Sequence, residues 1–104
     1  MLAAIAVMTA DPDSQIPETL NEARYVQIIE LEDGSTQYGQ AVSREDDVLQ
    51  LITEHGCRAL ICGQISPPVR QSLREKDVLC FDGYLYQAQQ VRRLLYTGVL
   101  PGIK

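Results

Sequence analysis

Three uninterrupted apolar runs constrain the fold of this chain more than any other feature of its sequence. They cover residues 2–8, 59–62 and 78–81. Half-exposed strands alternate between apolar and polar side chains, whereas strands of a parallel sheet are buried on both faces and are apolar throughout. We therefore predict a central strand over residues 2–8, with both faces covered, and two shorter buried strands at the other runs.

A β-hairpin is predicted between the first and second apolar runs. Residues 24–31 are rich in β-branched and aromatic side chains, which favour strands. Asp33-Gly34 follows, a dipeptide that suits the positive φ angles of a tight hairpin turn, and it leads into residues 36–40. These two strands should therefore be antiparallel.

Helix signals separate the remaining strands. Residues 43–46 (SRED) offer a side-chain acceptor for free backbone amides and acids facing the helix dipole, and Gly56 is placed to end that helix. Ser66, followed by two prolines, predicts the N-cap of a second helix. An apolar stripe within residues 83–98, including Val91, predicts a third.

The predicted order is β, ββ hairpin, α, β, α, β, α. Crossover helices between parallel strands are right-handed, and apolar parallel strands need helices on both sheet faces. A three-layer α/β/α sandwich follows. At 104 residues the chain can build one core and not two, so residues 1–104 are expected to form a single domain.

Charge and composition disfavour several partners. The formal net charge is −5, which would repel a phosphate backbone, so nucleic acid is not expected as a partner. The apolar run at residues 2–8 is too short to span a bilayer and lacks a basic leader, so we expect no membrane association. Three cysteines in such a chain favour free thiols and a cytoplasmic location.

The sequence favours binding over catalysis. No nucleophile with a neighbouring base can be assembled from it, so no catalytic residue is assigned and the chain is expected not to be an enzyme. His55, the single histidine, lies at a predicted helix end and receives no metal role. Cys57, Cys62 and Cys80 form no CxxC pair and are interpreted as buried, small apolar side chains.

One block of the chain resembles a known family. Residues 51–67 (LITEHGCRALICGQISP) combine a helix end, a glycine, a buried strand and a glycine turn before a helix that opens near proline. With the first strand, the long loop after it, the strand beginning near Tyr25 and residues 83–98, they resemble the dinitrogenase iron-molybdenum cofactor biosynthesis family. The resemblance extends over residues 4–100.

The resemblance implies a nitrogenase accessory factor-like domain with a ribonuclease H-like fold. Its mixed five-stranded sheet would have the order 3-2-1-4-5, with strand 2 antiparallel. It also implies a carrier of the iron-molybdenum cofactor or of its metallocluster precursor, so the cofactor would be an iron-molybdenum or other iron-sulfur-type cluster. The partners would be nitrogen-fixation proteins or other cluster-assembly proteins. Nuclease activity is not implied, because two-metal cleavage needs clustered carboxylates and residues 2–8 contain none.

The sequence departs from the family in the loop between strands one and two. The family commonly has His-Phe-Gly-Arg there, and the matching positions here are Thr19, Leu20, Asn21 and Glu22. A metal site is therefore not assigned. The alternative function is a binding or regulatory module for another small anionic ligand.

The strand order implied by the resemblance locates a candidate site. Ligands of open α/β sheets bind outside the carboxyl ends of the strands, where the strand order reverses. Glycine there permits close backbone approach and a helix N-terminus attracts anions, although Gly63 also suits a simple turn and Ser66 an N-cap. The predicted ligand-binding residues are Thr9, Asp11, Ser14, Thr19, Asn21, Gly63, Gln64, Ile65 and Ser66.

Two cysteines occupy similar positions in neighbouring strands. Cys62 and Cys80 each lie near the end of a predicted parallel strand. With equal register their side chains would lie side by side on one face, close enough for a disulfide or a shared soft metal. Two reduced, buried thiols are the simpler expectation.

Overall fold

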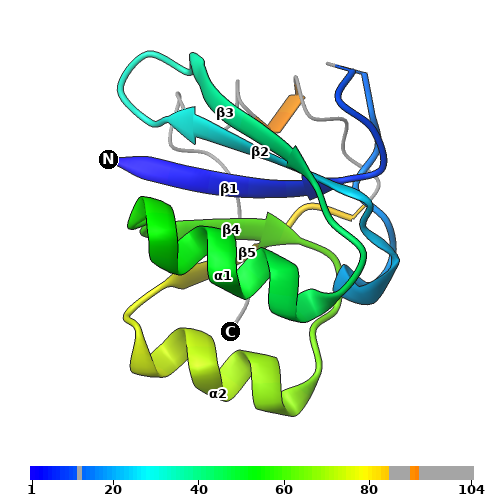
Figure 1. Ribbon diagram of the computed structural model, residues 1–104, viewed down its shortest axis with the longest axis vertical. Coiled ribbons are helices and arrows are strands. Elements are labelled where there is room, and N and C mark those ends of the chain that lie inside the picture. Colours follow the sequence, from blue (N-terminus) through cyan, green and yellow to red (C-terminus); the bar gives the residue numbers. More distant parts are fainter. Residues whose placement is uncertain (12, 85–89, 92–104) are drawn as a thin grey trace.

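A mixed five-stranded sheet organises the protein (Figure 1). The structure is a computed structural model, and residues 1–11, 13–84 and 90–91 are described. The strands are β1 (Leu2–Val7), β2 (Tyr25–Glu30), β3 (Thr36–Ala41), β4 (Ala59–Cys62) and β5 (Leu79–Asp82), in the order β3-β2-β1-β4-β5. β2 is antiparallel to both β1 and β3, and β4 is parallel to β1 and β5. The predicted strand order and the antiparallel second strand are confirmed.

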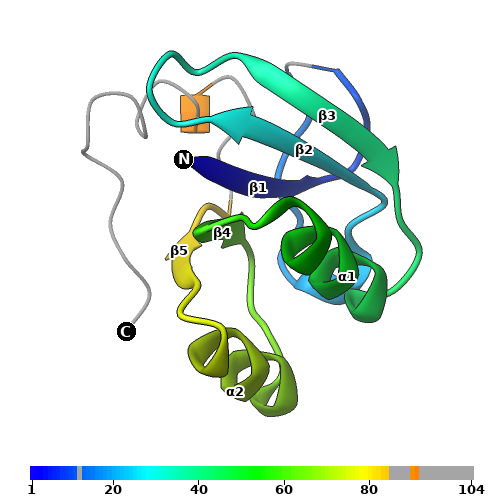
Figure 2. The same cartoon turned by 60° about the vertical axis from the view of Figure 1, so that its left-hand side comes forward.

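Helices α1 (Glu45–His55) and α2 (Pro67–Glu75) cover the same face of this sheet (Figure 2). The crossovers that contain them, from β3 to β4 and from β4 to β5, run in the same direction across the sheet. Right-handed crossovers in one direction place their helices on one face. Val48 and Ile52 of α1 and Leu73 of α2 are buried there in one core with Leu60. Neither of these helices, nor any other in the described ranges, is long and apolar enough to cross a membrane.

The opposite face of the sheet has its own core. Ile5, Ile61 and Ile29 pack there with Ile16, from the loop after β1, and with Val91. Residues 3–7 of β1 are 0% exposed, which confirms the prediction of a central strand with both faces covered. The predicted third helix, and with it most of the third layer of the α/β/α sandwich, lies outside the described residues apart from Val91 and its neighbour.

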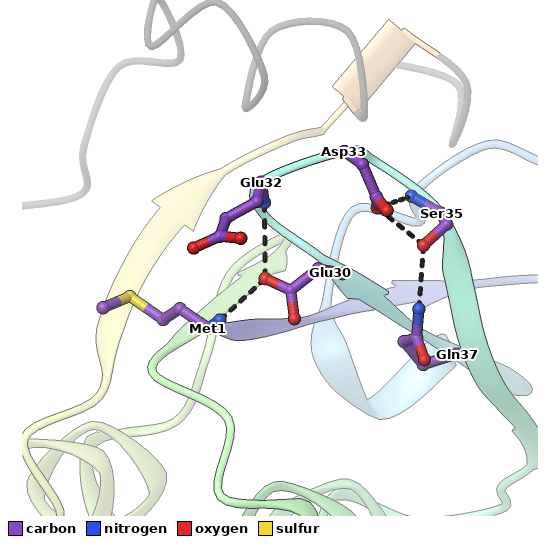
Figure 3. Close-up of polar contacts among 6 residues, drawn as sticks. All are labelled: Met1, Glu30, Glu32, Asp33, Ser35 and Gln37. Carbon is purple, nitrogen blue, oxygen red and sulfur yellow. Dashed lines mark hydrogen bonds and ion pairs between the residues drawn. The ribbon is translucent and has the colours of Figure 1, made fainter.

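The β2–β3 hairpin turns at the predicted Asp33-Gly34, where Gly34 has φ +71°. The Asp33 carboxylate accepts hydrogen bonds from the Ser35 amide at 2.8 Å and the Ser35 hydroxyl at 2.6 Å (Figure 3). At the end of β2, just before the turn, Glu30 pairs with the amino group of Met1 at 2.7 Å. The turn is therefore held by a side chain of its own, as is usual for aspartate in turns.

The start of α1 differs in detail from its prediction. Arg44 and not Ser43 is the N-cap, and the carboxylate of Asp47 is the capping acceptor. Its Oδ2 accepts hydrogen bonds from the backbone amides of Ser43 at 2.9 Å and Arg44 at 3.2 Å, and from the Ser43 hydroxyl at 3.1 Å. The predicted end is confirmed, because Gly56 adopts the left-handed conformation with φ 66°.

The start of α2 also has an unexpected contact. Ser66 occupies the predicted N-cap position and Pro67 begins the helix, but the Ser66 side chain makes no capping hydrogen bond. Its hydroxyl instead donates to Oε2 of Glu45, in the first turn of α1, at 3.4 Å. Ser66 therefore connects the N-terminal ends of the two helices.

Candidate functional site

The first part of the loop after β1, which contains the predicted site residues Thr9, Asp11 and Ser14, is closed largely by its own hydrogen bonds. The hydroxyl of Ser14, a buried residue, accepts from the amides of Met8 at 3.1 Å and Thr9 at 2.8 Å. The Asp11 amide donates to Thr9 Oγ1 at 3.2 Å. The side-chain amide of Gln27, a buried residue, donates to the Asp11 carbonyl at 3.3 Å. Thr9 and Asp11 remain exposed at the carboxyl end of β1.

Returning from this loop, the chain runs beside the end of β4. Thr19 forms a parallel bridge with Gln64. The Leu20 amide donates to the Gln64 carbonyl at 2.8 Å, and the Gln64 amide donates to the Glu18 carbonyl at 2.7 Å. The chain itself thus occupies part of the crevice at the switch in strand order.

Gly63 is close-packed against this returning segment. A Cβ atom at Gly63 would collide with the carbonyl oxygens of Pro17 and Glu18. The close backbone approach that the glycine permits is therefore to the protein's own chain. Sequence reasoning anticipated a close approach, but the partner could not be identified because the path of a loop leaves no periodic pattern.

The other predicted residues lie around this contact. Thr19 donates from its hydroxyl to Oε1 of Glu22 at 2.9 Å, so two positions at which the chain departs from the family it resembles hydrogen-bond to each other. Asn21 is exposed, whereas Ile65 and Ser66 are half-buried. The structure brings Thr19, Gly63 and Gln64 together, while the loop of Thr9, Asp11 and Ser14 forms a second group. Ligand binding by either group remains a prediction.

The prediction that Cys62 and Cys80 lie side by side is wrong in register. Cys62 pairs with Asp82, and Cys80 pairs with Leu60, so the two thiols are offset by two positions along neighbouring strands. They do share the helix-covered face. All three cysteines have free thiols, as predicted. Burial raises the pKa of the Cys57 thiol to about 11 and that of Cys62 higher still.

His55 contacts an aromatic ring. Its imidazole lies against the ring of Tyr38 on β3, with centroids 4.6 Å apart and planes at 33°. Among the described residues no group of three or more His, Cys, Asp or Glu side chains could hold a metal ion. The contact with Tyr38 gives His55 a packing role at the end of α1.

A pocket that sequence reasoning missed lies between α2 and β5. Its volume is about 180 Å³. Arg70 and Arg74 project from successive turns of α2, and Cys80 comes from β5. Burial raises the pKa of the Cys80 thiol, and the positive charges of the two arginines lower it in part. The remaining lining is apolar: Ile65, Leu73, Val78 and Leu79.

A second pocket of about 320 Å³ lies beside the N-terminal ends of β4 and β5 and shares Val78 with the first. It is lined by Thr53, Cys57, Arg58 and Lys76, among others. The Lys76 ammonium donates to Thr53 Oγ1 at 2.9 Å and lies at the C-terminal end of α2, where a positive charge complements the helix dipole. Lys76, one of the two cations that line this pocket, thus has a structural role already.

Several solved structures share the fold. The apo form of the orange protein from Desulfovibrio gigas has a TM-score of 0.80 at 13% identity, covering 98% of this chain and 92% of that one. TM1290 from Thermotoga has a TM-score of 0.77 at 18% identity, covering 97% and 91%. MJ0327 from Methanocaldococcus jannaschii has a TM-score of 0.72 at 18% identity, covering 97% and 94%. At these identities the likeness establishes the fold alone.

Family membership follows from the sequence. Among curated proteins, none matches the chain. The model of the family described as "Dinitrogenase iron-molybdenum cofactor" matches residues 1–98, which is nearly the whole chain. The resemblance noted from residues 51–67 and the strand order are thereby confirmed. The chain belongs to the dinitrogenase iron-molybdenum cofactor family.

Proposed function

We propose that this chain is a small, non-enzymatic carrier of the iron-molybdenum cofactor or of a metallocluster precursor. Family membership over residues 1–98 is the observation on which the proposal rests, because it relates the chain to that cofactor. In this role the cluster is cargo that is received and passed on. The partners would be nitrogenase-pathway proteins or other cluster-assembly proteins in the cytoplasm.

The chemistry of the described residues favours a loosely held cargo. They provide no group of three or more His, Cys, Asp or Glu side chains for direct ligation. Burial raises the pKa of each thiol, so the cysteines stay protonated at neutral pH, and a protonated thiol is a poor metal ligand. A cluster would therefore be held through charge and hydrogen bonds, which permit release to an acceptor.

An anaerobic titration tests the carrier proposal. The purified full chain would be mixed with an iron-sulfur-molybdenum precursor, followed by absorption spectroscopy, size-exclusion chromatography and metal analysis of the protein peak. We expect co-elution of iron and molybdenum with the protein and a changed absorption spectrum. Elution of all metal with the small molecules, with an unchanged spectrum, would sink the proposal.

A binding or regulatory module for another small anion is the second candidate. Thr19 and Glu22 stand where the family commonly has histidine and arginine, and their side chains are hydrogen-bonded to each other. The arginine-lined pocket beside α2 offers positive charge elsewhere. Thermal-shift measurements separate the candidates, because a ligand that binds only the folded state raises Tm. Stabilisation by simple anions, but not by clusters, would favour this second function.

A further inference from the structure

Among the described residues, two arginines of α2 have no ion-pair or hydrogen-bond partner at the pocket beside β5. Arg70 and Arg74 both line this pocket. Within the described part of the chain, neither guanidinium forms an ion pair or a side-chain hydrogen bond. The chain has 14 acidic residues and a net charge of −5, so carboxylates are plentiful. Among the described residues, the positive charge at this pocket is nevertheless not paired with a carboxylate.

This arrangement is unfavourable for the helix itself. Like charges four residues apart on a helix repel each other. Arg74 lies in the last turn of α2, where the helix dipole favours a cation, but Arg70 lies in the N-terminal half and receives no such compensation. A bound anion between the two guanidinium groups would offset both their mutual repulsion and the unfavourable interaction of Arg70 with the helix dipole.

The other walls of the pocket suit such an anion. Ile65, Leu73 and Val78 supply apolar surface, which lowers the local dielectric and strengthens charge-assisted hydrogen bonds. The Cys80 thiol, half-buried and held protonated, adds a weak S–H donor. The volume of about 180 Å³ is below the roughly 300–1,000 Å³ of pockets that hold drug-sized ligands. It suits a mononuclear anion.

We propose that the pocket between α2 and β5 binds a small tetrahedral inorganic dianion through Arg70 and Arg74, with Cys80 beside it. The ligand class includes oxoanions such as phosphate and molybdate and their thio-substituted counterparts. The site goes beyond the carrier proposal, since it needs no assembled cluster.

Calorimetric titration of the full chain tests the site. The probes are inorganic phosphate, molybdate and tetrathiomolybdate, each at constant ionic strength. We expect saturable binding, weakened at least tenfold in the double variant Arg70→Gln, Arg74→Gln. The control variant Arg44→Gln, Arg58→Gln removes the same charge elsewhere, including from the second pocket, and should change affinity less than twofold. Equal weakening in both variants would indicate general electrostatics and overturn the proposal.

A second readout uses the thiol at the site. Each probe anion should slow the alkylation of Cys80 in the wild-type chain at fixed pH, and this protection should vanish in the Arg70→Gln, Arg74→Gln variant. Circular dichroism checks that both variants are folded. Protection that survives loss of both arginines would refute the site. Binding of an assembled cluster without any binding of the mononuclear anions would also refute it, while leaving the carrier proposal intact.

Discussion

At the scale of single residues, Gly63 is the described glycine at which an added Cβ atom would meet backbone atoms. A methyl group there would collide with backbone carbonyls of Pro17 and Glu18, which cannot move as a flexible side chain could. We predict that Gly63→Ala lowers the free energy of unfolding by about 1–3 kcal/mol or more, the usual cost of overpacking. Gly34→Ala is the control, because φ is +71° but nothing lies within 4 Å. Urea unfolding of both variants measures the difference, and a smaller loss at Gly63 than at Gly34 would contradict this account.

The three thiols should differ sharply in reactivity. Cys57 and Cys62 are 3% and 0% exposed, and burial raises the pKa of both thiols, that of Cys57 to about 11. Cys80 is only half-buried, and two arginines partly offset the effect of burial on its pKa. Because the thiolate is the nucleophile, iodoacetamide at pH 8 should label Cys80 first. Mass spectrometry follows the labelling, with unfolded protein as the control in which all three react alike.

At the scale of elements, Asp47 determines the start of α1. Hydrogen bonds from Ser43 and Arg44 hold the pKa of the Asp47 carboxyl below its ordinary value of 3.8. The stabilisation is therefore present above that value and is lost as the pH falls through the lower folded-state pKa. Asp47→Asn should lower Tm by a few degrees at pH 7, and by less near pH 2. Asp46→Asn, an exposed neighbour with the same charge change, should have the smaller effect at pH 7.

Periodicity predicted the described strands and helices but not all of their positions, because the strand predicted as buried at residues 78–81 is the edge strand β5, in which Leu79 is 64% exposed. The apolar run at residues 2–8 and the glycine at position 56 each indicated a correct strand or helix boundary. The register of Cys62 and Cys80 was missed because it depends on the length and path of the crossover through α2, which leaves no trace in the apolar pattern. The capping acceptor was missed because Ser43, just before α1, and three acids in its first turn compete for the same backbone amides.

At the scale of the whole molecule, the sequence predicted where the crevice at the switch in strand order lies, but not which residues occupy it. Strand order placed Gly63 and Gln64 at the switch point, yet the chain's own residues 17–20 lie against them. The pocket of Arg70, Arg74 and Cys80 joins a helix face to a strand, so it could be found only once the rotation of α2 was known. Local motifs are visible in a sequence, whereas a pocket assembled by tertiary packing is not.

The two cores should unfold as one unit, because β1 contributes side chains to both of them. Ile5 is fully buried in the core opposite the helices, and Leu60 of the adjacent β4 is fully buried beneath them. We predict that Ile5→Ala and Leu60→Ala each cost about 2–5 kcal/mol, the usual range for such truncations. Leu79→Ala, at a side chain 64% exposed, should cost less than about 0.5 kcal/mol. Urea unfolding followed by circular dichroism and by tyrosine fluorescence should give coincident transitions in every variant. Separate transitions in Ile5→Ala or Leu60→Ala would show that one face can lose its packing while the other keeps it, and that sharing a central strand does not couple them.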